Sequence, residues 1–352
     1  MTIMTVVQGR MDRSLQASGS TSVSFVYPTR DRPSFVREAL ATLKVQQGGD
    51  FEVIVSDNYS DPSLSCEQVC LDSGLANLHY VHPPQPLPMG EHWEYPLPFA
   101  QGEYVSYLSD KMFILPNALW YIEQGVAAKP EIVTWVTDNY WPAVFPDYFG
   151  AGTYGQGLPG PGGPFSPQAE LSRRGTTGRS PNSQPDYCRG KLVFGVFHRD
   201  LVARSVLRFG GLFHSAGWGT TGLSPDYTSM ILGLSEAHSA LELTASCGMQ
   251  IHTDISGGML IDTHDAIARA VLPEALWPDL PIPGLYASQH NIVARDYVAL
   301  KQHFDLPFDF DIGIWIAYCA ADILRPGRVW SSPDAEAQQK AILTTFLAAG
   351  GT

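Results

Sequence analysis

A strand–helix–strand pattern in residues 23–60 is the feature that most constrains the fold of this chain. Residues 23–27 form an apolar run that ends in the turn Pro-Thr-Arg-Asp-Arg-Pro, and a segment with one apolar face at helical spacing follows. Residues 51–55 are a second apolar run and lead directly to Asp57. Strands joined by a helix in this way pair in parallel, and ligands bind at their carboxyl ends. The pattern therefore predicts an open α/β sheet with polar groups gathered at one edge.

The same alternation continues along the chain. Further strands are expected at residues 78–82, 104–108, 132–136, 191–197 and 249–255. Helices are expected at residues 90–99 (interrupted), from 116 to before Pro130, at 198–206, from 225 onward, and toward the C-terminus. Strands that alternate with helices predict a mostly parallel sheet flanked by helices.

Residues 150–187 differ from the rest because they are rich in Gly, Pro and Ser. This composition predicts a long loop or flexible insertion. Long irregular segments inside compact domains are either functional lids or disordered, and the sequence leaves both alternatives open.

Composition excludes some classes of partner. The chain has 352 residues, enough to bury a sizeable core, and 44% of them are hydrophobic, as in ordinary soluble globular proteins. The formal net charge of −13 argues against nucleic acid as the main partner, because phosphate backbones bind to dense basic surfaces. A single nucleotide needs only a local basic cluster, such as Arg30 and Arg32.

The five cysteines are scattered and odd in number, which predicts reduced thiols in a cytoplasmic protein. Cys66 and Cys70 are four positions apart, but no second pair or nearby His completes a zinc pattern. Residues 1–20 are expected to be a polar, disordered leader without a signal peptide, and no stretch approaches the roughly 18 apolar residues of a membrane span. We expect at most peripheral membrane contact, and the oligomeric state stays open.

Residues 23–60 resemble the start of the family 2 glycosyltransferases of the GT-A fold. In that family the first strand runs into a similar turn, here Pro28-Thr29 followed by Arg32-Pro33, and the second ends in an acidic pair, here Asp57-Asn58. The resemblance implies a Rossmann-like, mostly parallel GT-A (nucleotide-diphospho-sugar transferase) sheet flanked by helices. It implies a domain at 21–265, with a nucleotide-binding half at 21–126 and an acceptor half at 127–265. A helical extension would follow at 266–352.

The resemblance places nucleotide binding on the two turns, at Pro28, Thr29, Arg30, Arg32, Asp57 and Asn58. A carboxylate at a strand end accepts the ring N–H of uracil or guanine, and a site built on that contact rejects bases without this donor. Asp57 is the candidate, with Pro28 and Thr29 as the floor. The alternative is that Asp57 only caps a turn.

The diphosphate site of the family follows a Gly-Glu-Tyr segment and ends in an Asp-x-Asp group that holds a divalent metal. The corresponding residues here are Ser109, Asp110, Lys111 and Met112, so the group is degenerate. Mg²⁺ and Mn²⁺ prefer hard oxygen ligands, which Met112 does not offer. Either Asp110 binds a metal with help from elsewhere, or Lys111 neutralises part of the leaving charge. Our hypothesis is that sugar transfer depends weakly on a divalent metal or not at all. His252 is a further candidate for the diphosphate.

A catalytic base is implied at the start of a helix beyond the sheet. Asp226, in Ser224-Pro225-Asp226, stands in that context, and a helix N-terminus favours the ionised carboxylate. An inverting transfer needs such a base to take the proton of the acceptor hydroxyl. The alternative is plain helix capping, and the family's usual first acid is Pro225 here.

Other candidates are assigned to the donor sugar or acceptor: Glu91, Trp93 and Trp218. For Trp93, core packing is the alternative to sugar stacking. Asp254 is considered beside His252 on the late strand. Arg173, Arg174 and Arg179 either clamp phosphate or are solvated.

Together these features predict an inverting hexosyltransferase that moves a sugar from a UDP- or GDP-sugar to a hydroxyl acceptor. Synthesis of a surface polysaccharide, glycolipid or small glycoside is the expected setting. A relative that binds a nucleotide or sugar without catalysis is the rival, because the Asp-x-Asp group is damaged. A sugar-1-phosphate nucleotidyltransferase shares the architecture, but that class expects a Gly-rich phosphate loop, and residues 29–32 contain no glycine.

Overall fold

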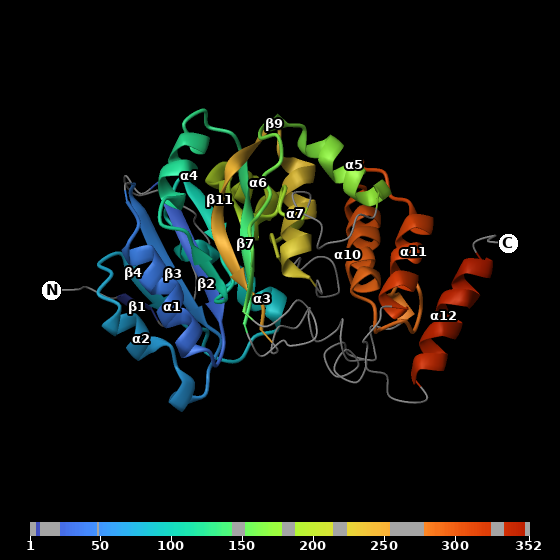
Figure 1. Cartoon of the computed structure of the whole chain (residues 1–352), viewed down its shortest axis with the longest axis horizontal. Helices are drawn as coiled ribbons and strands as arrows, with labels where there is room; N and C mark the ends of the chain where they lie inside the picture. The colour runs from blue at the N-terminus through green and yellow to red at the C-terminus, as the bar shows by residue number, and fades with distance from the viewer. Residues whose placement is uncertain are drawn as a thin grey trace. The chain divides into compact units, whose positions relative to one another are not determined.

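A computed structural model describes residues 5–7, 22–47, 49–142, 152–177, 187–213, 224–253, 278–324 and 334–348 (Figure 1). The chain divides into two compact units. Unit 1 comprises Met1–Tyr140, Tyr154–Pro167 and Gln184–Ile251. Unit 2 comprises Trp141–Thr153, Gln168–Ser183 and His252–Thr352.

Unit 1 is built on a twisted mixed sheet. Among the described residues its strands follow the order β1-β4-β3-β2-β5-β10-β7-β11-β6, with β8 on β7 and β9 on β11. The strands are β1 (Thr5–Val7), β2 (Val23–Thr29), β3 (Phe51–Asp57), β4 (Leu78–Val81), β5 (Tyr104–Tyr107), β6 (Met112–Ile114), β7 (Ile132–Trp141), β8 (Thr153–Gly155), β9 (Gly163–Phe165), β10 (Gly195–His198) and β11 (Ala240–Ile251).

The pairing of the strands confirms the predicted, mostly parallel α/β sheet. Strands β1, β4, β3, β2 and β5 pair in parallel with their neighbours, as do β7 and β11. Strand β10 is antiparallel to both β5 and β7, and β6 and β9 are antiparallel to β11. All seven residues of β2 are buried, as expected for a strand that is covered on both faces.

The helices of unit 1 lie beside the sheet in Figure 1. They are α1 (Pro33–Lys44), α2 (Glu67–Asp72), α3 (Met89–Glu94), α4 (Ala118–Val126), α6 (Arg199–Phe209) and α7 (Pro225–Glu236). Helix α4 packs on β11, α6 on β10 and on α7, and α3 contacts α7. The expected interrupted helix is α3 followed by a 3-10 turn at Leu97–Phe99.

Residues 191–197 differ from the single strand that we expected. Leu192–Phe194 form a 3-10 turn, and the strand β10 begins only at Gly195. A Cβ atom at Gly195 would lie 2.4 Å from the carbonyl oxygen of Val133. The strand therefore begins where the absence of a side chain lets the backbone approach β7 closely.

The Gly-rich stretch 150–187 contains more regular structure than the expected loop. Its described part holds β8, β9 and the helix α5 (Pro167–Thr177). Pro167 suits the first helical position, and Glu170 pairs with Arg173 and Arg174, three and four positions later. These pairs support the helix, and near its end the carbonyl oxygen of Gly175 accepts a hydrogen bond from Trp315 Nε1 at 3.0 Å.

Unit 2 contains the expected C-terminal helices, α10 (Gln289–Phe304), α11 (Ile312–Ile323) and α12 (Asp334–Ala348). Helix α11 packs on both of the others. At the start of α10, Ser288 Oγ and His290 Nδ1 contact Asp322 Oδ2 at 2.7 and 2.8 Å. Burial acts to raise the pKa of Asp322, but the hydrogen bonds from His290 and Ser288 lower it below its usual value. Among the described residues, no helix has the length and apolar character needed to cross a membrane.

Candidate functional site

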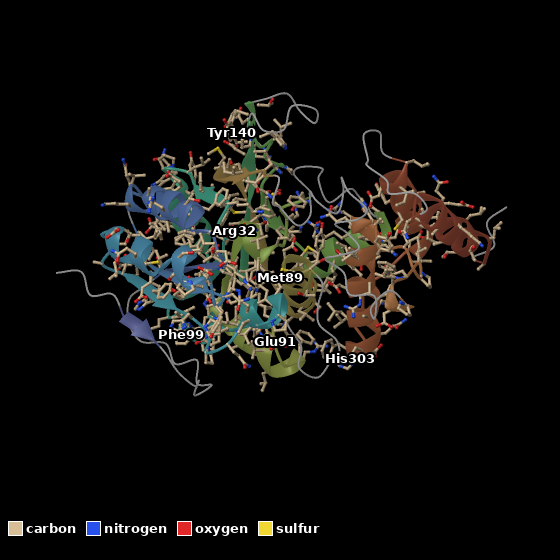
Figure 2. The ribbon with its side chains drawn as sticks, turned by 90° about the horizontal axis from the view of Figure 1, so that it is seen from below. Arg32, Met89, Glu91, Phe99, Tyr140 and His303 are labelled. Atoms are coloured by element: carbon tan, nitrogen blue, oxygen red, sulfur yellow. The ribbon has the colours of Figure 1, made fainter. Side chains whose placement is uncertain are left out.

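The carboxyl ends of β2 and β3 lie side by side. Thr29 and Asp57 are register partners in the parallel ladder, and the N–H of Asn58 donates to the carbonyl oxygen of Thr29 at 2.9 Å. The turn after β2 and the turn after β3 are therefore adjacent, as the sequence pattern predicts. Figure 2 labels Arg32 in the first of these turns, and Met89 and Glu91 on α3.

The carboxylate of Asp57 is enclosed by hydrogen bonds and only 1% exposed. Its Oδ2 accepts the N–H of Cys66 at 2.9 Å and the hydroxyl of Tyr80 at 3.0 Å, and its Oδ1 accepts the hydroxyl of Ser60. Burial, and secondarily the charge of Asp57, raises the pKa of the Cys66 thiol to about 12, so this thiol stays protonated. Asp57 thus accepts hydrogen bonds that stabilise the turn after β3, as the turn-capping alternative predicts. It also lies at the strand end where the sequence predicts that the base binds.

Asn58 connects the end of β3 to the segment before α3. Its Nδ2 donates to the carbonyl oxygen of Leu87 at 2.8 Å, and its Oδ1 accepts the N–H of Leu87 at 3.0 Å. The amide therefore pairs with the backbone as a neighbouring strand would. This contact positions the Pro-rich segment and α3 beside the site.

Two residues with positive φ lie in the adjacent turns. Asp31 and Tyr59 both have φ of 56°, a conformation that is uncommon for side chains other than Gly, Asn and Asp. The turns are joined, because the N–H of Asp31 donates to Ser60 Oγ at 2.7 Å and the N–H of Asp61 donates to Asp31 Oδ1 at 2.8 Å. The Tyr59 side chain is 53% exposed at this strained position. Strained backbone of this kind concentrates at ligand sites.

Asp110 joins this edge from the end of β5. Thr29 Oγ1 donates to Asp110 Oδ2 at 3.0 Å, and Arg32 Nη1 lies 3.3 Å from Asp110 Oδ1. Asp110 is 2% exposed, whereas the Arg32 side chain is 30% exposed. The structure therefore brings together Thr29, Arg32 and Asp110, and Thr29 is also the register partner of Asp57. The Arg30 side chain is 56% exposed and pairs with Asp31.

Lys111 adds a second cation next to Asp110. Burial lowers the pKa of Lys111 to about 8, with the charge of Arg32 acting in the same direction and that of Asp110 opposing it. An ammonium group with this pKa is half protonated near pH 8. The Ser109 hydroxyl lies 3.4 Å from Asp110 Oδ1 and from the N–H of Lys111, which holds the turn.

The donor set at Asp110 does not fit a divalent metal. One carboxylate is available there, and it already faces the guanidinium of Arg32 and the hydroxyl of Thr29. In the part of the chain that the structure describes, no three His, Cys, Asp or Glu side chains converge as metal ligands would. Mg²⁺ and Mn²⁺ require several oxygen ligands. The Asp110 carboxylate therefore already has a cation of the protein, Arg32, as a partner.

Asp226 lies in the first turn of α7 and pairs with a lysine that the sequence analysis did not identify. Lys191 Nζ donates to Asp226 Oδ2 at 3.0 Å. The Lys191 side chain is 0% exposed and that of Asp226 is 28% exposed. The ammonium lies 3.9 Å from the ring centre of Tyr187 and 3.7 Å from that of Tyr227.

The aromatic candidate on α3 is packed against other rings. Trp93 stacks on Tyr107 with ring centres 5.9 Å apart and meets Phe213 edge to face at 5.5 Å. The carbonyl oxygen of Phe213 accepts the hydroxyl of Thr228 on α7 at 3.2 Å. Trp93, which is half-buried, therefore contacts core rings and, through Phe213, connects α3 to the helix that carries Asp226.

Helix α3 carries two acidic side chains, Glu91 and Glu94. Glu91 is half-buried on this helix. It is Glu94, not singled out in the sequence, that accepts the N–H groups of Leu212 and Phe213, both at 2.9 Å. These hydrogen bonds could not be predicted from the sequence, because a single Glu at the end of a short helix belongs to no motif that indicates its partners.

The remaining candidates either have contacts of their own or lie outside the described residues. His252 stacks on Trp141 with ring centres 4.7 Å apart. Arg173 and Arg174 pair with Glu170 on their own helix. Trp218, Asp254 and Arg179 lie outside the described residues.

Comparison with known proteins gives structural likenesses only. No family model matches the chain, and no curated protein matches its sequence. A crystal structure of residues 1–349 of TarS from S. aureus is similar at 15% identity and a TM-score of 0.48, covering 94% of this chain and 87% of that one. The same TarS fragment in complex with UDP-GlcNAc is similar at 14% identity and a TM-score of 0.47, over 94% and 93%. The longer TarS structure is similar at 16% identity and a TM-score of 0.47 over 94% of this chain, which spans about half (53%) of it.

Proposed function

We propose that the chain is an inverting glycosyltransferase that uses a nucleoside-diphosphate sugar, UDP- or GDP-linked, and a hydroxyl acceptor. The observation that carries this proposal is the gathering of Thr29, Arg32, Asp57, Asp110 and Lys111 at the carboxyl ends of three neighbouring parallel strands. Ligands of open α/β sheets bind at such an edge. The positive charges of Arg32 and Lys111, beside the buried Asp110, would attract an anionic diphosphate.

The nucleoside is assigned to the turns after β2 and β3. Pro28 and Thr29 form the floor, and Asp57 accepts the ring N–H of the base. Because Asp57 is 1% exposed, the Ser60 hydroxyl that bonds to its Oδ1 has to rotate aside for this contact. The exposed ring of Tyr59 offers a stacking face, which contributes about 1–3 kcal/mol for a nucleobase.

The diphosphate is assigned to Arg32 and Lys111. Arg32 offers a planar guanidinium suited to phosphate oxygens, and Lys111 supplies a point charge. Asp110 orients Arg32 through the 3.3 Å contact. In this assignment fixed cations neutralise the leaving group, as the degenerate Asp-x-Asp sequence suggests, and no metal is required.

The transfer itself is assigned to Asp226. The acceptor oxygen attacks the anomeric carbon from the face opposite the diphosphate, and the bond from that carbon to the diphosphate oxygen breaks. The proton of the acceptor hydroxyl passes to the Asp226 carboxylate, and the nucleoside diphosphate leaves with the bonding electrons. General-base assistance of this type contributes about 10²–10⁴-fold to a rate.

Calorimetric titration with UDP and GDP, combined with an assay for nucleoside diphosphate released from UDP- and GDP-sugars, tests the proposal. We expect one nucleotide to bind and its sugar to be turned over. The double variant R32M/K111M should bind at least about tenfold more weakly, since it loses charge-assisted contacts. Absence of binding by both nucleotides would overturn the proposal. Binding without turnover would support instead the non-catalytic relative, for which the single acid at Asp110 is the favouring observation.

A further inference from the structure

Lys191 is a fully buried ammonium on the turn between residues 187 and 191. Its side chain is 0% exposed, and its Nζ lies 3.0 Å from Asp226 Oδ2. The faces of Tyr187 and Tyr227 flank it at 3.9 and 3.7 Å, and the ring of Phe194 lies at 5.9 Å. Burying a charged group is unfavourable unless the charge is paired. The contacts of Lys191 with the Asp226 carboxylate and with the aromatic rings must therefore offset the desolvation free energy of its ammonium.

The turn that carries Lys191 is shaped for this placement. Gly190 has φ of 80°, a conformation that favours glycine, and a Cβ atom there would lie 2.8 Å from Leu234 of α7. The N–H of Lys191 donates to the carbonyl oxygen of Cys188 at 3.1 Å. The lysine therefore enters from a tight turn packed directly on the helix that presents Asp226.

The contact with Lys191 involves only one of the two carboxylate oxygens of Asp226. Within the described residues the hydrogen bond of this carboxylate is made through Oδ2. The side chain is 28% exposed, which suits a group that must meet an acceptor from solution. The ring faces of Tyr187 and Tyr227 hold the ammonium in place, so its hydrogen bond restricts the rotation of the Asp226 carboxylate.

We propose that Lys191 is a positioning residue that orients the Asp226 carboxylate, so that Oδ1 faces the acceptor hydroxyl. This inference rests on the proposed function, because it assigns a partner to the base of that reaction. Lys191 acts only through Asp226 and does not touch the substrate. The aromatic pair Tyr187 and Tyr227 keeps the ammonium in place.

The variants K191M and K191A test this assignment. Met keeps the apolar stem between the rings, whereas Ala opens a space beside Asp226. We expect K191M to lower kcat by about 100-fold while the KM for the donor changes less than about twofold, because the contact serves the base and not the nucleotide. Short alkylammonium ions should restore part of the kcat of K191A, with a dependence on chain length, and should not restore K191M.

The control variant is R189M, two residues earlier in the same turn. Arg189 Nη2 forms a largely buried ion pair with Glu242 at 2.7 Å, so this variant removes a comparable pair that does not include Asp226. R189M should keep kcat within about threefold in buffer at a temperature where it is folded. An equal loss in R189M and K191M would overturn the inference, since it would indicate a general structural effect.

A double variant separates this inference from the proposed function. If Lys191 acts through Asp226, adding K191M to D226N should not lower the residual transfer further. A multiplicative loss in the double variant, or full kcat in K191M, would overturn the role of Lys191 while transfer by the wild type still supported the function. A wild type without transfer would overturn the proposed function itself.

Discussion

Thr29 Oγ1 donates a hydrogen bond to Asp110 Oδ2 at 3.0 Å and so joins the end of β2 to the turn after β5. Thr29 is at the same time the register partner of Asp57 on β3. One threonine therefore aligns the ends of three parallel strands. The charges that follow these strands, Arg32 and Lys111, are placed at a common edge by this alignment.

Metal removal tests the assignment of charge neutralisation to the protein. Because Asp110 already faces Arg32 and the described residues offer no metal donor set there, transfer should persist in EDTA at no less than about half of its rate. The measurement is turnover in EDTA against turnover with added Mn²⁺. Loss of all activity in EDTA, with recovery on addition of Mn²⁺, would contradict the expectation.

Nucleotide affinity should depend on pH through Lys111. Its pKa is lowered to about 8, so below this pH the protonated side chain attracts the diphosphate, and above it the charge is lost. Affinity for the nucleoside diphosphate should fall as pH rises from 7.5 to 9.5, by up to about tenfold per pH unit if only the protonated form binds. Calorimetry across this range checks the slope.

The variant K111M should bind the nucleotide more weakly at pH 7.5 and show a flatter profile. The matched control is K129M, because Lys129 is 75% exposed and pairs with Glu103. K129M should keep the wild-type profile. A wild-type slope in K111M would show that another group controls the pH dependence.

The sequence predicted the parts of the site that depend on strand direction. Parallel strands with polar residues at their carboxyl ends must bring residues 29, 57 and 110 to one edge, and the structure does so. The pairing of Lys191 with Asp226 was not predictable in the same way, because the two residues are far apart in the chain and meet through packing of a turn on α7. The amide pairing of Asn58 with Leu87 depends likewise on tertiary contact.

Helix α5 shows why the composition of residues 150–187 did not predict their structure. The Gly, Pro and Ser content of residues 150–187 indicates a loop, and this signal averages over many positions. The helix is supported by ion pairs of Glu170 with Arg173 and Arg174 and by a tertiary contact, in which Trp315 Nε1 donates to the carbonyl oxygen of Gly175 at 3.0 Å. Charged pairs at this spacing contribute only about 0.2–0.5 kcal/mol each, which a compositional pattern does not register.

Replacing Tyr59 by Gly should raise stability and lower nucleotide affinity. The φ of 56° costs a bulky side chain roughly 1–2 kcal/mol, and glycine adopts it freely. Since the ring is 53% exposed, little burial is lost, so the melting temperature should rise by about 2 °C. Loss of the stacking face should weaken nucleotide binding by about tenfold.

The matched control for Tyr59 is D305G. Asp305 has φ of 50° at the end of α10, so this variant relieves a similar strain. It should gain stability without a change in nucleotide affinity. If Y59G binds the nucleotide as tightly as the wild type, Tyr59 does not form part of the nucleoside site.

Stability should decrease at acidic pH because of His92. This side chain is 4% exposed, and its Nε2 lies 3.0 Å from Ser56 Oγ. Burial lowers the pKa of His92 to about 4, below the usual value near 6.5. Between these values the unfolded chain binds a proton that the folded chain does not. The contribution to the free energy of unfolding is therefore unchanged above pH 6.5 and falls by about 3 kcal/mol on going to pH 4.

Urea unfolding of the wild type and of H92Q at pH 7 and pH 4.5 measures the contribution of His92 to the free energy of unfolding. The amide of Gln can still bond to Ser56 but does not titrate, so H92Q should lose less stability than the wild type over this interval. Equal losses in the two proteins would contradict the assignment. The comparison within each protein removes the effect of the substitution itself.

Replacing Asp226 by Asn should lower transfer by at least about 1,000-fold and leave nucleotide affinity within about twofold. The amide oxygen of Asn can still accept the hydrogen bond of Lys191, so the fold around the buried ammonium is retained, but the amide does not take a proton from the acceptor. D200N is the matched control, because Asp200 holds the equivalent second position of α6 and its side chain is 77% exposed. D200N should transfer at the wild-type rate. If D226N keeps its transfer activity, Asp226 only caps α7, and the base must be sought elsewhere in the chain.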